Sequence, residues 1–317
     1  MATSEIAWGD GTGDKIYLTY TASAGDQTVS VSSDANTGAA RSKTVTFSAT
    51  GVSPVTLSVS QEAGEPSPDR ACLTFRSTSS NTLSMTCNGT AAPVLYYSTN
   101  GTTWTLWDYS SLSITEGHPV FIYGNNPSAF SSSTDNYACF VMGGDGRVNI
   151  SGNIMTLADN GLGTMTTIPR TYYFYRIFRN CAVLRTAPAF PATTLKNYCY
   201  MQAFANCTYL LTPPELPATT LTSNCYNQMF RECRALTSAP VLPALTLTTR
   251  CYYYMFYNCR ALSWVKALFT TTPGSYTTSW LEQVNSTGTF VKNSAATWTT
   301  TGVSGVPTNW TIEYASA

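Results

Sequence analysis

The chain has 317 residues, only 11% of them charged, and its formal net charge is zero. This length suits two to four domains. The abundance of Thr, Ser, Tyr, Gly and Asn argues against long amphipathic helices and indicates a mainly β chain of several domains. No apolar run approaches the ~18–20 residues of a membrane-spanning helix, and residues 1–8 contain no secretory signal. We therefore expect neither a membrane span nor a signal peptide.

Charge is unevenly distributed along the chain. Residues 170–270 hold ten basic and two acidic side chains, a net +8, and the remainder holds 7 basic and 15 acidic side chains, a net −8. Either the basic and the acidic region dock on each other, or the difference is ordinary variation in surface charge. Alternatively, the basic region meets an anionic glycan or an acidic partner, because charge of one sign concentrates the other.

Residues 1–65 consist of short runs in which apolar and polar residues alternate between turn residues. Each run has one apolar face, which predicts a small antiparallel sandwich. The predicted strands are 15–21, 27–32, 43–50 and 55–61. Residues 62–69, with Gly and two Pro among polar residues, predict a linker.

A longer pattern in this module carries a resemblance. The pattern Asn-x-Gly-x-x-Arg-x-x-x-Val-x-Phe runs from Asn36 to Phe47, and Leu-x-Val-x-Gln runs from Leu57 to Gln61. These residues resemble the second half of a BACON domain, an immunoglobulin-like (Ig-like) module of gut Bacteroidetes proteins and of some phages that infect them (crAss-like phages). The resemblance implies an association with carbohydrate or mucin but transfers no binding residues. A spacer or anchor is the alternative role.

Residues 66–165 predict a second β-sandwich-like domain. Its predicted strands are 72–75, 82–87, 94–98, 104–107, 120–124, 138–142 and 148–152. Asn100-Gly101 predicts a hairpin turn. Trp104 and Trp107 are three residues apart, so they point to opposite faces of a strand. Either both rings are structural, or one of them, with Trp107 as the candidate, offers a stacking surface to a sugar.

The region 166–270 is organised by a constant period of 26 residues. The recurring residues are Cys181, Cys207, Cys233 and Cys259; Phe178, Phe204, Phe230 and Phe256; Leu184, Leu210, Leu236 and Leu262; Cys199, Cys225 and Cys251; Pro188, Pro214 and Pro240; Pro191, Pro217 and Pro243. A fixed period of this size is typical of a solenoid in which each repeat buries its apolar face against its neighbours.

One repeat shows the expected local structure. Residues 224–233 predict a short helix, because Met229, Phe230 and Cys233 share a helical face, and residues 236–243 predict a short strand that ends at a proline. The motif Met-Phe-x-x-Cys-x-x-Leu-x-x-Ala-Pro-x-Leu-Pro resembles BspA-like leucine-rich repeats of surface proteins from bacteria, their phages and some protists. The resemblance covers residues 172–268. It implies a right-handed solenoid of α/β repeats used in adhesion or assembly.

Side chains that leave the repeat pattern, or that face outward from it, are the candidate contacts. In the predicted strand, Leu236, Ala239 and Val241 are expected to point inward. Tyr253 and Tyr254 interrupt the repeat on the predicted helix side, and exposed aromatic residues anchor interfaces. The candidate ligand or partner contacts are Arg185, Thr186, Thr212, Thr237, Ser238, Tyr253, Tyr254 and Trp107, and Leu211 shares the outward face.

Seven of the ten cysteines belong to the repeat. Buried free thiols, a ladder of disulfides and metal ligation are the three alternatives, and the lack of a nearby His or of a CxxC pair disfavours metal. The non-repeating residues 271–317, with Trp280, Trp298 and Trp310, predict a structural C-terminal cap, since a solenoid needs its open end covered.

No reaction centre is visible. His118, the one histidine, stands in a turn without a nucleophile motif, and Asp145 stands in a Gly-Asp-Gly turn that lacks the Lys of a phosphate-binding loop. Glu215 and Glu232 do not fall one repeat apart, as a paired-carboxylate glycosidase site would favour. We expect no enzyme activity and no cofactor, and an accessory to glycan-processing enzymes is a weaker third class.

The two resemblances favour a non-enzymatic structural and adhesion protein of a phage virion. It would be a head or tail fibre or a decoration protein that projects outward and binds host or mucosal glycans. Its partners would be other virion proteins and further copies of itself, as a homotrimer, and it would bind no nucleic acid. The alternative is a secreted, BspA-like adhesin of the bacterial cell surface whose export signal has been removed.

Overall fold

The computed structural model describes residues 2–7, 15–20, 29–33, 41–49, 52–61 and 70–315, so the predicted linker lies outside the described residues. The chain divides into two compact units, Met1–Ser67 and Pro68–Ala317. The described residues of the first unit are all in strands, those of the second are mainly in strands and turns, and the described part contains one helix, the short 3-10 segment η1 (Ile154–Leu157). The chain is therefore mainly β. None of its described segments is a helix long and apolar enough to cross a bilayer.

The first unit contains two small antiparallel sheets. One has the order β1-β2-β3 and the other pairs β4 with β5. Their bounds are β1 Ala2–Ala7, β2 Lys15–Tyr20, β3 Val29–Ser33, β4 Arg41–Ala49 and β5 Val52–Gln61. Ile16 and Leu18 from one sheet pack with Val45 from the other, so the apolar faces of the alternating strands meet between the sheets. β1 is an addition, because the sequence pattern did not predict a strand there.

The second unit begins with a two-sheet sandwich. One sheet has the order β14-β13-β6-β11-β8-β9, and the other has the order β10-β7-β12. The strands are β6 Leu73–Ser77, β7 Asn81–Asn88, β8 Leu95–Ser98, β9 Thr105–Leu106, β10 Leu112–Ile114, β11 Val120–Gly124, β12 Tyr137–Gly144 and β13 Val148–Ser151. All but β10 were predicted from alternation. Phe75 and Phe140 face each other between the sheets, with ring centroids 5.3 Å apart.

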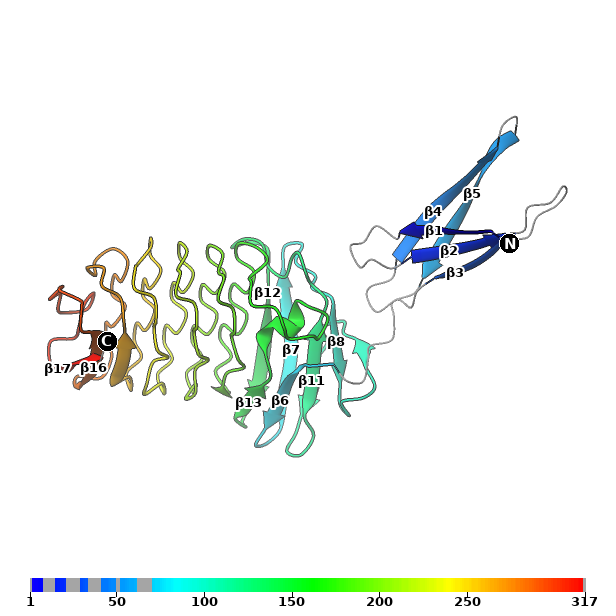
Figure 1. Cartoon of the computed structure of the whole chain (residues 1–317). Helices are drawn as coiled ribbons and strands as arrows, with labels where there is room; N and C mark the ends of the chain where they lie inside the picture. The colour runs from blue at the N-terminus through cyan, green and yellow to red at the C-terminus, as the bar shows by residue number, and fades with distance from the viewer. Residues whose placement is uncertain are drawn as a thin grey trace. The chain divides into compact units, whose positions relative to one another are not determined.

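Four coils follow, beginning 26 residues apart at Tyr172, Tyr198, Asn224 and Arg250; we call them coils 1 to 4 and, together, the coil stack. Figure 1 shows them side by side, from green to orange. The first ten residues of each coil form consecutive turns, which we call the turn side; the segment that begins at the repeating leucine is the strand side. β14 (Leu184–Thr186) and β15 (Trp264–Ala267) are strands of the strand side.

The turn side contains no helix, so the predicted helix over 224–233, and with it the prediction of α/β repeats, is wrong. N–H groups of alternate residues donate to the next coil, as Phe178 does to the carbonyl of Ala203 at 2.8 Å. The N–H groups between them bond three residues back within the coil. Every fourth residue has a positive φ, as at Arg176 (60°) and Asn180 (66°). A left-handed residue at each fourth position interrupts α-helical hydrogen bonding.

The repeating aromatic residues form two continuous stacks through the core. One runs from Phe140 through Phe178, Phe204, Phe230 and Phe256, with centroid separations of 5.3, 5.4, 5.6 and 5.6 Å. The other runs through Phe174, Tyr200, Tyr226 and Tyr252 at 6.2, 6.0 and 6.1 Å. Both stacks end against Trp280. Stacked rings add stability beyond the area that they bury.

The coil stack continues the sandwich and does not sit apart from it. β13 pairs in parallel with β14, so one sheet of the sandwich runs into the strand side. On the turn side, the N–H of Phe140 in β12 donates to the carbonyl of Ile177 in coil 1 at 2.8 Å. A single buried apolar cluster extends from the sandwich through all four coils to the last residues. One apolar core therefore runs through the sandwich, the coil stack and the C-terminal end.

The C-terminal end is closed by non-repeating residues. β15, β16 (Gly288–Asn293) and β17 (Trp310–Ala315) form a parallel sheet in that order. Trp280 and Trp298 are buried, and their indole N–H groups donate to the carbonyls of Gly305 at 2.9 Å and Phe269 at 3.1 Å. Residues after 271 thus cover the open end of coil 4, as a cap must.

Candidate binding surfaces of the coil stack

The strand side carries a groove where the sandwich meets the first coils. It has a volume of about 200 Å³, and Arg147, Arg185, Tyr209, Leu211 and Ala235 line it. Arg147 comes from the turn between β12 and β13, and the other four residues come from coils 1, 2 and 3. We call this the strand-side groove.

The strand-side groove combines apolar and cationic surface. The guanidinium of Arg147 lies over the ring of Tyr209, 3.5 Å from its centroid. Tyr209 and Leu211 nevertheless expose 47% and 40% of their surface, and Arg185 is also exposed. Sugars and other small polar ligands bind where a few directed polar groups surround an apolar platform. The groove provides the apolar platform, and the side chains of Arg147 and Arg185 belong to its lining.

Coil 2 makes the groove by departing from its neighbours. Tyr209 stands where coil 1 has Val183 and coil 3 has Ala235, so one large ring projects beside two smaller side chains. Neither Arg147 nor Tyr209 was singled out from the sequence. The signal that could have found Tyr209 was this break in a column of small residues. Arg147 carried no signal, because its place beside coil 2 follows from the joining of β13 to β14.

The predicted strand-side contacts lie along one face of the coils. Arg185, Thr212, Thr237 and Ser238 are exposed, and Thr186 is half-buried, with its hydroxyl donating to the Asn149 side chain at 2.9 Å. Of these residues only Arg185 lines the groove. The others lie on the same outward face of the strand side. Leu211 lies on that face and also in the lining of the groove.

One inward residue of the strand side was predicted wrongly. Leu236 and Ala239 are buried as expected, but Val241 is 42% exposed and Leu242 is buried. The segment 236–243 forms only isolated bridges, at Ser238 and Leu242. Because Pro240 has no N–H to donate, the chain does not keep a regular two-residue alternation there.

A second predicted contact surface lies on the turn side of coil 4. Tyr253 and Tyr254 are half-buried, and their ring centroids are 4.5 Å apart; Tyr257 packs 5.3 Å from Tyr254. Two guanidiniums flank these rings, with Arg250 5.6 Å from the centroid of Tyr253 and Arg231 5.4 Å from that of Tyr257. The arrangement is a tyrosine patch that contacts its own arginines and presents its remaining edges outward.

Trp107 is not available as a stacking surface. It is 3% exposed, packs against Phe140 in the main core and donates its indole N–H to the carbonyl of Ser110 at 2.9 Å. Trp104 points to the opposite face of the sheet, as expected, and is buried in a separate cluster with Tyr96 and Tyr123. Both rings are therefore structural.

The repeat cysteines are buried thiols. All ten cysteines are free, and all seven in the repeat are buried. Each thiol of the Cys181 column donates to a carbonyl in the preceding strand or coil, as Cys207 does to Phe178 at 3.0 Å. Burial raises the pKa of Cys199 to about 12 and that of Cys251 to about 11. Such protonated, enclosed thiols are poor nucleophiles and poor metal ligands.

The remaining candidates for chemistry stand apart from one another. His118 and Asp145 are exposed in turns, and the His118 ring lies 3.4 Å from the carbonyl oxygen of Glu116 in its own turn. Among the described residues, no three His, Cys, Asp or Glu side chains gather as metal ligands would.

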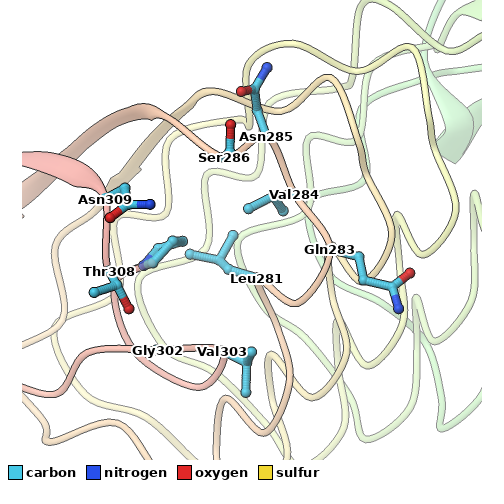
Figure 2. Close-up of a pocket in the computed structure, with 10 residues that line it drawn as sticks. Leu281, Gln283, Val284, Asn285, Ser286, Gly302, Val303, Thr308 and Asn309 are labelled. Carbon is cyan, nitrogen blue, oxygen red and sulfur yellow. The ribbon is translucent and has the colours of Figure 1, made fainter.

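A further pocket, of about 260 Å³, lies in the C-terminal cap. Figure 2 shows its lining: Leu281 and Val284 lie near its middle, with Gln283, Asn285 and Asn309 around the edge. The lining contains amides, hydroxyls and aliphatic groups but no ionisable side chain. This chemistry suits a neutral polar ligand.

Comparison with known proteins adds no relative to this picture. A scan against models of protein families found no match, and searches of curated proteins and of solved structures found no significant one. The resemblances to BACON domains and to BspA-like repeats therefore stay predictions that rest on the motif residues.

Proposed function

We propose that this chain is a non-enzymatic adhesion protein that binds glycans through its coil stack. The strand-side groove carries the proposal. There the exposed ring of Tyr209 and the side chain of Leu211 provide an apolar platform for the carbon face of a sugar, and Arg185 provides a donor for its hydroxyl or carboxylate groups.

The proposal extends to the architecture. The 26-residue period, the inward Cys, Phe and Leu columns and the parallel bridges between strand sides support a short leucine-rich-repeat solenoid of the BspA-like kind. The two-sheet packing of residues 2–61 supports a BACON-like, Ig-like module before it. In this proposal the chain is a virion fibre or decoration protein of a phage. It meets host or mucosal glycans and assembles with other virion proteins and with copies of itself, as a trimer.

A glycan array probed with the purified full chain tests the binding part. We expect binding to a subset of mucin or capsular glycans, and at least tenfold weaker binding by Tyr209→Ala, which corresponds to about 1.4 kcal/mol. Tyr314→Ala is the matched control, because Tyr314 is 61% exposed and lies in β17, away from the groove. Silence on mucin and capsular glycans alike would refute glycan adhesion and leave a purely architectural role.

Antibody labelling under the electron microscope tests the location. In the virion proposal, label decorates phage particles. The alternative, a bacterial cell-surface adhesin, predicts label confined to bacterial envelopes, and that result would refute the virion proposal while leaving the groove intact.

A further inference from the structure

A polar hollow lies on the turn side, where one column of the repeat has a single small residue among large ones. The column reads Arg179, Ala205, Arg231 and Tyr257 in coils 1 to 4. Ala205 leaves a gap between two arginines that stand two coils apart. A polar pocket of about 120 Å³ fills this gap, lined by Arg179, Gln202, Ala205, Asn206, Gln228 and Arg231.

Hydrogen bonds hold one wall of this pocket in place. Arg176 donates from Nε to the amide oxygen of Gln202 at 2.9 Å, and Gln202 donates to the amide oxygen of Gln228 at 3.3 Å. Arg231 donates from Nη1 to the same Gln228 oxygen at 3.1 Å. The guanidiniums therefore bond to neutral amides and keep their positive charge uncompensated.

Carboxylates do not occupy the pocket. Glu232, in the neighbouring column, is bound instead to Arg234 at 2.9 Å and to the amide of Asn258 at 2.6 Å. The side chain of Arg179 has no hydrogen-bond or ion-pair partner within the described part of the chain. Arg179 also lines a neighbouring hollow of about 270 Å³, together with Arg176, Tyr137 and Thr86. The two hollows share Arg179, and we call the surface that their arginines Arg176, Arg179 and Arg231 line the turn-side path.

We infer that this turn-side path binds the acidic groups of an anionic polysaccharide, a carboxylate or a sulfate ester. Arg179 and Arg231, on alternate coils, can each pair with one such group, because planar guanidiniums match the oxygen pairs of both anions. The inference deepens the proposed glycan adhesion and rests on it, but it concerns a different face of the coil from the strand-side groove.

Spacing favours a polysaccharide over a compact anion. Neighbouring strands in a sheet stand ~4.8 Å apart, so arginines on alternate coils are roughly 10 Å apart. That is close to the length of a disaccharide, which is the unit by which charge recurs in many acidic polysaccharides. The three amide side chains between the arginines match sugar hydroxyls, which both donate and accept hydrogen bonds.

Binding of dextran sulfate and of polygalacturonate to the full chain tests the inference, with unsulfated dextran as the neutral probe. Tighter binding of dextran sulfate would indicate a site for sulfate esters, and tighter binding of polygalacturonate would indicate a site for carboxylates. Arg179→Gln with Arg231→Gln should weaken binding of the preferred polyanion at least tenfold. Ala205→Leu should weaken it similarly without any change in charge, because it fills the hollow. Arg170→Gln, at an exposed position outside the pocket, should leave binding unchanged.

Three results would overturn the inference. Equal weakening by Arg170→Gln would indicate diffuse charge attraction, and equal competition by polyglutamate would indicate an acidic protein as the ligand. Full binding by the double variant would place the polyanion elsewhere. In each case array binding that depends on Tyr209 would still stand, so failure here is distinct from failure of glycan adhesion. Thermal unfolding of each variant shows whether it has folded.

Discussion

The seven buried thiols make the stability of the coil stack sensitive to alkaline pH. Burial raises the pKa of each repeat cysteine, by removing the thiolate from water. In the unfolded chain these thiols ionise with a pKa of ~8.5. Above that pH the unfolded state loses protons that the folded state keeps, so the free energy of unfolding falls as pH rises. Stability is full below pH ~8.5 and declines through the window up to the raised folded pKa values.

The magnitude follows from the difference between the two pKa values. A thiol that stays protonated in the fold costs about 0.8 kcal/mol at pH 9 and about 2 kcal/mol at pH 10, relative to neutral pH. Seven such thiols therefore remove on the order of 6 kcal/mol at pH 9 and of 14 kcal/mol at pH 10. Because domains are stable by only ~5–15 kcal/mol, the second unit should lose most of its stability by pH 10.

Urea unfolding at a series of pH values between 7.5 and 10, with reductant present, measures this decline. The urea midpoint should fall steadily, and Cys233→Ala should flatten the profile by about 2 kcal/mol at pH 10, because it removes one ionising thiol. A midpoint that stays constant up to pH 10 would contradict the reasoning. It would mean that the thiols ionise inside the folded coils, which requires water among them.

Three further predictions concern the packing. Phe204→Leu breaks the stacks on Phe178 and Phe230 and should cost about 2 kcal/mol in urea unfolding, whereas Leu211→Ala at an exposed site should cost less than about 0.5 kcal/mol. Far-ultraviolet circular dichroism should lack the double minimum of an α-helix, since the turn side contains none; a helical spectrum would refute the turn assignment. Gly288→Ala places a Cβ 2.8 Å from the Trp310 ring and against the Ser263 carbonyl, so the Tm should fall by about 2–8 °C.

The periodic part of the fold follows from the sequence, because identical side chains at a 26-residue step are buried at equivalent places in successive coils. The local structure of the turn side could not be read in the same way. Met229, Phe230 and Cys233 share one face of a helix, but turns that repeat every four residues also bury all three. Spacing alone therefore does not separate a helix from a ribbon of turns. The hydrogen bonds between coils decide it.

The candidate sites were predictable only in part, for a related reason. Arg185 could be chosen because it faces outward next to a repeating leucine. The groove around it also needs Arg147, which reaches coil 2 only because β13 pairs with β14. For Trp107 the sequence left a structural ring and a stacking surface open, because alternation shows that Trp104 and Trp107 face opposite ways but does not show that both faces of the sheet are covered; the structure bears out the structural alternative.

The strand-side groove and the turn-side pocket at Ala205 both arise where coil 2 differs from the coils on either side. Ala205 stands between Arg179 and Arg231, and Tyr209 stands in a column of smaller residues. The core columns of coil 2 are unchanged, since Phe204 and Cys207 stack like their counterparts. The residues of the two proposed binding sites are therefore distinct from the core residues of this coil. A chain carrying Ala205→Arg and Tyr209→Ala would keep the aromatic stack, and with it the Tm, but would lose the turn-side pocket and the ring of the strand-side groove together.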